Sequence, residues 1–219
     1  MIRLHKCLVL LVSVFLFGSL SAQSNIRTYE RISSDSVEIL RETYGKHKTY
    51  PKEFEEQFLI ALSHYPQLRD VKVNLLFDKE KTTMSARPDI GSLFCRKRVY
   101  NIRINHSESF EGILLKDIPF NAQIGVIGHE LAHLVDYEQK NFFRIIGTGI
   151  GYLNPRYKRK LEHKIDGVTI HHGLGWQLYD WARYSMDETY STPKYVRFKK
   201  KIYMGPDKIL TLMGSPVNL

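Results

Sequence analysis

Cysteine is scarce in this chain of 219 residues, which contains only Cys7 and Cys95. The first lies in a stretch that we expect to be removed on export, so the mature protein would keep a single thiol. One thiol excludes an internal disulfide and any zinc site built on cysteine pairs. A metal ion, if there is one, must therefore be held by His, Glu or Asp side chains.

Long apolar runs are also rare, and the pronounced one, Cys7–Gly18, follows the basic residues Arg3 and Lys6. A basic start, an apolar core and then the small residues of 19–22 are typical of a secretory signal peptide, predicted over residues 1–22. The run is short for a membrane span, although an uncleaved anchor is the alternative. We expect a periplasmic or extracellular protein.

The rest of the chain shows no repeats or low-complexity tracts and is long enough for one domain. We expect a polar N-terminal extension over residues 23–50 that wraps a domain spanning residues 51–219. The formal charge is +9. Its excess lies in three basic runs, Arg96–Arg98, Arg156–Lys160 and Arg197–Lys201. In an exported protein these runs favour solvated helix faces, or attraction to an anionic envelope surface, over nucleic-acid binding.

The chemistry is concentrated in one motif, His129-Glu-Leu-Ala-His133, which lies inside an apolar stretch. Residues four apart share one face of a helix, so the two imidazoles can bind one metal ion. Glu130, about 100° round the helix, can take a proton from a metal-activated water and give it to a leaving amine. Two hydrogen-bonded core histidines are the alternative. The surrounding apolar spacing predicts a helix buried on most sides, where unpartnered polar groups are costly.

Periodicity along the chain predicts an α+β fold that is mostly helical, with a small mixed sheet packed on the motif helix. Helices are expected near 36–44, 52–65, 124–140, 154–172, 176–182, 193–203 and 207–213, and strands over 71–77, 82–86 and 99–105. An edge strand could pair with an extended substrate, and the last two strands are equal candidates for that edge. The apolar, glycine-containing stretch 142–153 is interpreted as helix packing or a flexible connection, with membrane contact as a lesser alternative.

A third metal ligand must come from further along the chain. Asp136 and Gln139 occupy the positions where the extended motif H-E-x-x-H-x-x-G-x-x-H has glycine and histidine. Asn154-Pro155 is typical of a helix start, and that helix would carry Glu162 and Asp166 on one face. One carboxylate can bind the metal while the other orients a ligand histidine.

The combination of H-E-x-x-H with a downstream E-x-x-x-D resembles the gluzincins, the thermolysin-like zinc metallopeptidases, over residues 122–166. The resemblance implies a zincin-like domain in which His129, His133 and Glu162 hold one Zn²⁺. It also implies that Glu130 is the catalytic base and that Asp166 is the partner of a ligand histidine, His129. The expected reaction is hydrolysis of a peptide bond in a protein or in a cell-wall peptide.

Several alternatives stay open at this point. Glu162 could instead pair with Lys158 or Arg159 on the helix surface. The rival third ligands are His163, His171 and His172, and the last two could also donate to an oxyanion. A transition-state hydrogen bond could come from Tyr157, Tyr190 or Tyr203. The alternative function is that of a non-catalytic zincin-fold binding or assembly factor of the cell envelope.

Overall fold

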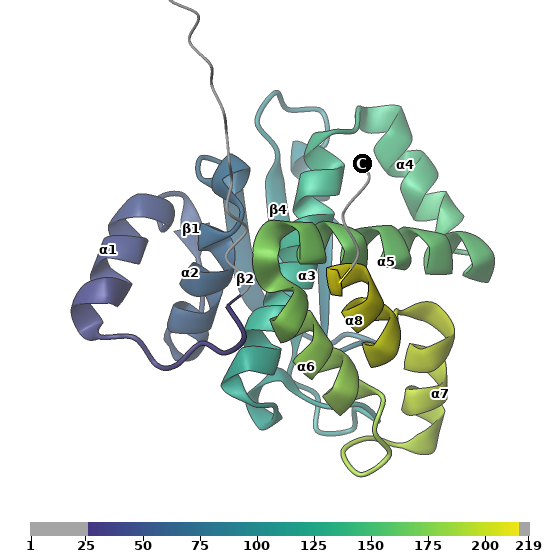
Figure 1. Ribbon diagram of the computed structural model, residues 1–219. Coiled ribbons are helices and arrows are strands. Elements are labelled where there is room, and N and C mark those ends of the chain that lie inside the picture. Colours follow the sequence, from purple (N-terminus) through teal and green to yellow (C-terminus); the bar gives the residue numbers. More distant parts are fainter. Residues whose placement is uncertain (1–25, 215–219) are drawn as a thin grey trace, which may run out of the picture.

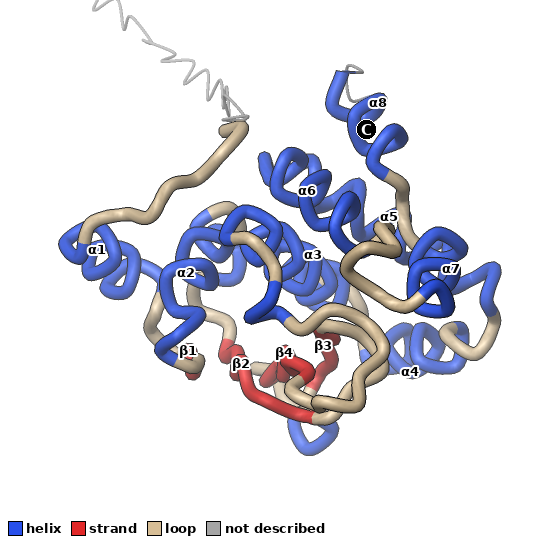
Figure 2. Tube along the Cα trace, turned by 90° about the horizontal axis from the view of Figure 1, so that it is seen from below, coloured by secondary structure: helices blue, strands red, loops and turns tan. Residues whose placement is uncertain are grey.

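The computed structural model describes residues 26–214, so the predicted signal peptide lies outside the described residues. The chain forms a mixed α/β structure that is mostly helical and contains one four-stranded sheet (Figure 1). In Figure 2 the sheet lies along one side of the molecule and most helices are gathered on the opposite side, with α3 next to the sheet. The general fold class predicted from the sequence is therefore confirmed.

The elements follow one another as a helix, a small sheet and then a succession of helices. The helices are α1 (Ser34–Tyr44), α2 (Glu55–Ser63), α3 (Phe120–Glu138), α4 (Phe142–Gly151), α5 (Pro155–Thr169), α6 (Gly175–Ser185), α7 (Pro193–Ile202) and α8 (Pro206–Gly214). The strands are β1 (Lys48–Thr49), β2 (Lys72–Asp78), β3 (Met84–Pro88) and β4 (Val99–Asn105). Each predicted helix is found, and stretch 142–153 is largely helical as well.

The strand order β1-β2-β4-β3 decides which strand has a free edge. Strand β4 is parallel to β2 and antiparallel to β3, so both of its sides are paired. The prediction that residues 99–105 could be the substrate-binding edge is therefore wrong. Of the two candidates, β3 is the edge strand, opposite the short edge strand β1, and it begins two residues later than predicted, at Met84. The short strand β1 was not predicted.

Helix α3 is the centre of the core. Every residue from Ala122 to Tyr137 is buried, because the sheet, α2, α5 and α6 surround it. A helix covered on all sides has no polar face, which explains the continuous apolar composition around the motif. The segment before α1 contacts the start of α3, since the Tyr29 N–H donates a hydrogen bond to Asn121 Oδ1 at 2.8 Å. Among residues 26–214, no helix is both long and apolar enough to cross a membrane.

Helix α5 begins as expected, with the Asn154 side chain accepting hydrogen bonds from the N–H groups of Arg156 and Tyr157. Its regular part ends at Thr169, earlier than predicted, and a wider turn over Ile170–Leu174 leads into α6. Within that turn Gly173 has a φ of 82°, a left-handed conformation that favours glycine.

Helix α6 lies close to the backbone of α3 at Gly125, and this contact can be tested. A Cβ atom there would lie 2.1 Å from the Gln177 carbonyl oxygen, so Gly125→Ala must displace backbone. We expect a loss of roughly 1–3 kcal/mol in the free energy of unfolding, measured by denaturant titration. The control is Gly167→Ala in α5, where a Cβ meets nothing within 4 Å. It should be neutral or stabilising by up to about 1 kcal/mol; equal stability of the two variants would contradict the close packing.

Candidate metal centre

Three buried side chains from two helices converge on one point. His129 and His133 lie one turn apart on α3, and Glu162 reaches them from α5. Their ligand atoms all lie within 4.8 Å of one another, and the group could hold a metal ion. Glu162 Oε2 lies 3.1 Å from His129 Nε2 and 3.4 Å from His133 Nε2. The alternative that Glu162 pairs with Lys158 or Arg159 on the helix surface is not what the structure has, because Glu162 is 2 % exposed.

The donor atoms and their separations can be compared with those of known zinc sites. Two imidazole nitrogens and one carboxylate oxygen, with an open fourth position, are typical of catalytic zinc sites. Bonds of 2.0–2.1 Å in a tetrahedral arrangement place neighbouring ligand atoms about 3.3 Å apart. The separations from Glu162 Oε2 to the two histidines, 3.1 and 3.4 Å, lie on either side of that value, and all three ligand atoms lie within 4.8 Å of one another. The residues present therefore fit a small divalent ion of this kind.

The side chains behind the group fix its orientation. Asp166 Oδ1 lies 2.9 Å from His129 Nδ1, and Asp166 Oδ2 accepts a hydrogen bond from the Met204 N–H at 3.0 Å. A carboxylate on Nδ1 keeps the proton on that nitrogen and leaves Nε2 free to bind a metal. The hydroxyl of Tyr152 donates to Glu162 Oε1 at 3.0 Å, so the other oxygen of Glu162 is directed at the histidines.

The charges of this cluster call for a cation. Glu130, Glu162 and Asp166 are buried, and no Lys or Arg of the described chain forms an ion pair with them. Burial lowers the pKa of His129, but its hydrogen bonds to Asp166 and Glu162 outweigh this effect and raise that pKa to about 10. Burial raises the pKa of Glu162, but the charge of His133 and the hydrogen bond with His129 hold it well below its usual range. The buried ammonium of Lys199 attracts all three carboxylates. A proton on His129 or a bound metal ion would supply positive charge in direct contact with Glu162.

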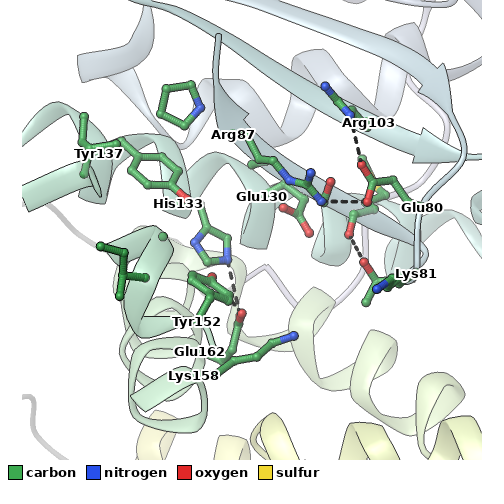
Figure 3. A pocket seen from close by; sticks show the side chains of 18 of the residues that line it. Glu80, Lys81, Arg87, Arg103, Glu130, His133, Tyr137, Tyr152, Lys158 and Glu162 are labelled. Carbon is green, nitrogen blue, oxygen red and sulfur yellow. Dashed lines mark hydrogen bonds and ion pairs between the residues drawn. The ribbon is translucent and has the colours of Figure 1, made fainter. Parts of the chain in front are cut away.

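Glu130 differs from the other two carboxylates because it faces a cavity and not a partner. It makes no hydrogen bond or ion pair with any residue in 26–214, and burial raises its pKa. The cavity has a volume of about 860 Å³ and is also lined by His133, Glu162 and strand β3. Figure 3 shows Glu130, His133 and Glu162 at its wall, with Tyr152 and Lys158 beside them.

The remaining candidates from the sequence lie elsewhere. His163 contacts Lys208, and His172 stacks on Tyr65; neither they nor His171 belongs to the metal-binding group. Of the three tyrosines, Tyr203 lines the cavity, whereas Tyr157 and Tyr190 do not.

Two features of the site were not foreseen. Tyr152, which hydrogen-bonds Glu162, lies at the end of a stretch interpreted only as packing or a connection, and nothing local in the sequence marks it. Lys199 belongs to a basic run expected to be solvated, yet it is 4 % exposed, which corrects that expectation. Its Nζ lies 3.5 Å from the centre of the Tyr203 ring and 4.9 Å from that of Trp181. Burial lowers the pKa of Lys199 to about 8.

Comparison with known proteins gives no match to any family model, curated protein or solved structure.

Metal content tests the ligand assignment. We expect the purified protein to bind about one equivalent of zinc, and Glu162→Ala to lose most of it because an anionic ligand is removed. His163→Ala is the matched control, one residue along the same helix and outside the group. Elemental analysis after dialysis, with circular dichroism to check the fold, gives the comparison. Full zinc in Glu162→Ala together with loss in His163→Ala would overturn the assignment.

The role of Asp166 is tested separately, because its carboxylate touches a ligand and not the ion. Asp166→Asn keeps the size of the side chain but weakens the hydrogen bond with His129 Nδ1. We expect zinc affinity to fall about 10–100-fold, measured by competition with a chromophoric chelator. Unchanged affinity would mean that the 2.9 Å contact does not orient His129.

Proposed function

We propose that this chain is an exported, zinc-dependent peptidase with a zincin-like domain. A single observation carries the proposal. The carboxylate of Glu130 has no partner in the described chain and lines the same cavity as His133 and Glu162. A buried carboxylate beside a candidate metal-binding group, at the wall of an open cavity, suits proton transfer better than it suits structural support.

Each residue has a distinct part in the proposed reaction. His129, His133 and Glu162 would hold the zinc, and Asp166 and Tyr152 would orient two of these ligands. Zinc bound there would polarise the substrate carbonyl and lower the pKa of the attacking water. Glu130 takes the proton from that water and returns it to the leaving amine nitrogen. Its raised pKa brings its proton affinity closer to what a general base needs near neutral pH.

The free edge of β3 supports a peptide as the substrate. Residues Met84–Pro88 line the cavity, and among the described strands β3 pairs only with β4. An extended peptide can therefore add to β3 as a further strand through main-chain hydrogen bonds. A peptide lying along β3 would pass Glu130 and His133, which line the same cavity.

The cavity walls differ in character on their two sides. Helix α4 contributes the apolar residues Ile145, Ile146 and Ile150. The rim near the start of β3 is charged, because Glu80 binds Arg87 at 2.9 Å and Arg103 at 3.5 Å (Figure 3). Such a cavity suits a peptide with an apolar side chain on the α4 side.

The proposal is tested by Glu130→Gln, which keeps the shape of the side chain but removes the base. We expect zinc content to be retained and peptide cleavage to fall by about 10²–10⁴-fold. Zinc-loaded protein would be incubated with a mixture of synthetic peptides and the products identified by mass spectrometry. The control Glu53→Gln changes an exposed glutamate outside the cavity and should cleave like wild type.

Two results would contradict the proposal. If Glu130→Gln cleaves the peptides as fast as wild type, Glu130 is not the base. The second result combines two observations: zinc-loaded wild type cleaves no peptide, and cells that carry Glu130→Gln show none of the defects of cells that lack the gene. The chain would then act as a binding or assembly factor.

A further inference from the structure

Helix α4 turns its apolar face away from the core. Only Ile145 and Thr148 are buried in this helix. Phe143, Ile146 and Ile150, spaced i, i+3 and i+7, are 80 %, 42 % and 65 % exposed. Such a stripe is what a surface helix normally packs against another element. Figures 1 and 2 both place α4 at the periphery of the molecule.

The apolar surface continues beyond the helix. Leu153, which follows α4, is 84 % exposed, and Phe94 in the loop before β4 is 81 % exposed. The ring of Phe94 packs on that of Phe142 with centroids 4.4 Å apart, which joins the loop to the helix. We call these exposed residues the α4 face: Phe94, Phe143, Ile146, Ile150 and Leu153. Contiguous exposed apolar surface of this kind marks an interaction site.

The two segments that form the α4 face carry charges of one sign, whereas the acidic side chains of Glu80, Glu130 and Glu162 lie in the adjoining cavity. Residues 90–99 and 141–161 contain eight Lys and Arg residues and no Asp or Glu. Arg96, Lys97, Arg144 and Arg156 are exposed, and none of them forms an ion pair with a residue in the described range. The partner of this surface must therefore offer apolar material together with negative charge.

We propose that the α4 face docks on an anionic lipid surface, with α4 lying in the plane of the headgroups. Its apolar side chains would enter the boundary between headgroups and acyl chains, and the surrounding cations would bind lipid phosphates. This attachment lies on the bilayer and does not cross it. The proposal does not depend on peptidase activity.

Other occupants fit the observations less well. A second copy related by two-fold symmetry would bring two basic surfaces of the same sign together, which opposes association. A peptide substrate would occupy the cavity, but Phe143 and Leu153 do not line it. Ile146 and Ile150 belong both to the α4 face and to the cavity wall, so docked lipid would lie beside the cavity.

Vesicle co-sedimentation tests the docking surface. Wild type should bind phosphatidylcholine vesicles that contain phosphatidylglycerol at least about tenfold more tightly than phosphatidylcholine alone. The double variant Phe143→Ser/Ile150→Ser should bind the anionic vesicles at least about tenfold more weakly, because two apolar side chains are lost from the contact. Both positions are exposed, so the fold should survive. The matched control is Ile39→Ser, which changes an isoleucine of α1 that is 63 % exposed.

Hydrogen exchange shows which segments contact the vesicles. It thereby distinguishes docking through the α4 face from binding through the apolar run Cys7–Gly18, which is present in all variants. Anionic vesicles should slow exchange of the amides in 90–97 and 142–153 but not in α1. Binding that is equal in all variants, without slowing in these two segments, would overturn the proposal. Self-association of wild type that the double variant loses would also overturn it, since a second copy would then cover the α4 face.

Discussion

The position of His129 between two carboxylates of α5 is the interaction on which the site depends. Glu162 and Asp166, one turn apart, approach opposite nitrogens of the same imidazole at 3.1 and 2.9 Å. Burying these carboxylates is costly unless positive charge lies between them. Without a metal ion, a proton on His129 can supply that charge, since the two carboxylates raise the pKa of this imidazole, and a metal ion on Nε2 would replace it. Binding of a metal ion would therefore be coupled to the packing of α3 on α5.

The fold supports this interaction by surrounding α3 on all sides. The sheet lies on one side of the helix, and α2, α5 and α6 cover the others. Because Gly125 has no side chain, α6 approaches α3 closely enough to help fix the helix along its length. Beside the motif, the cavity is lined by residues of β3, α4 and α5. The β3 edge of the sheet thus lies next to the candidate metal centre.

Local patterns predicted most of the elements and the centre of the site. The Asn154 cap fixed the start of α5, and the spacing of four between Glu162 and Asp166 placed both on the side facing His129. The strand order could not be predicted. Strands β2 and β4 pair in parallel although β3 lies between them in the chain, and the apolar pattern of a strand does not indicate which strand will lie beside it. The burial of Lys199 also depends on distant rings, those of Trp181 and Tyr203. A run of basic residues contains no sign of that packing.

Helix α4 connects the two proposals. The contacts that hold it include the buried side chain of Ile145, the Asn141 cap, a hydrogen bond from Lys140 Nζ to Thr148 Oγ1 at 2.8 Å, and the packing of Phe142 on Phe94. An element with few buried side chains is among the least stable parts of a fold. Yet Ile146 and Ile150 of this helix form part of the cavity wall. Lipid docked on the α4 face would therefore contact two side chains that a bound peptide would also meet. Because the two proposed ligands share contacts on one helix, each is expected to change the binding of the other.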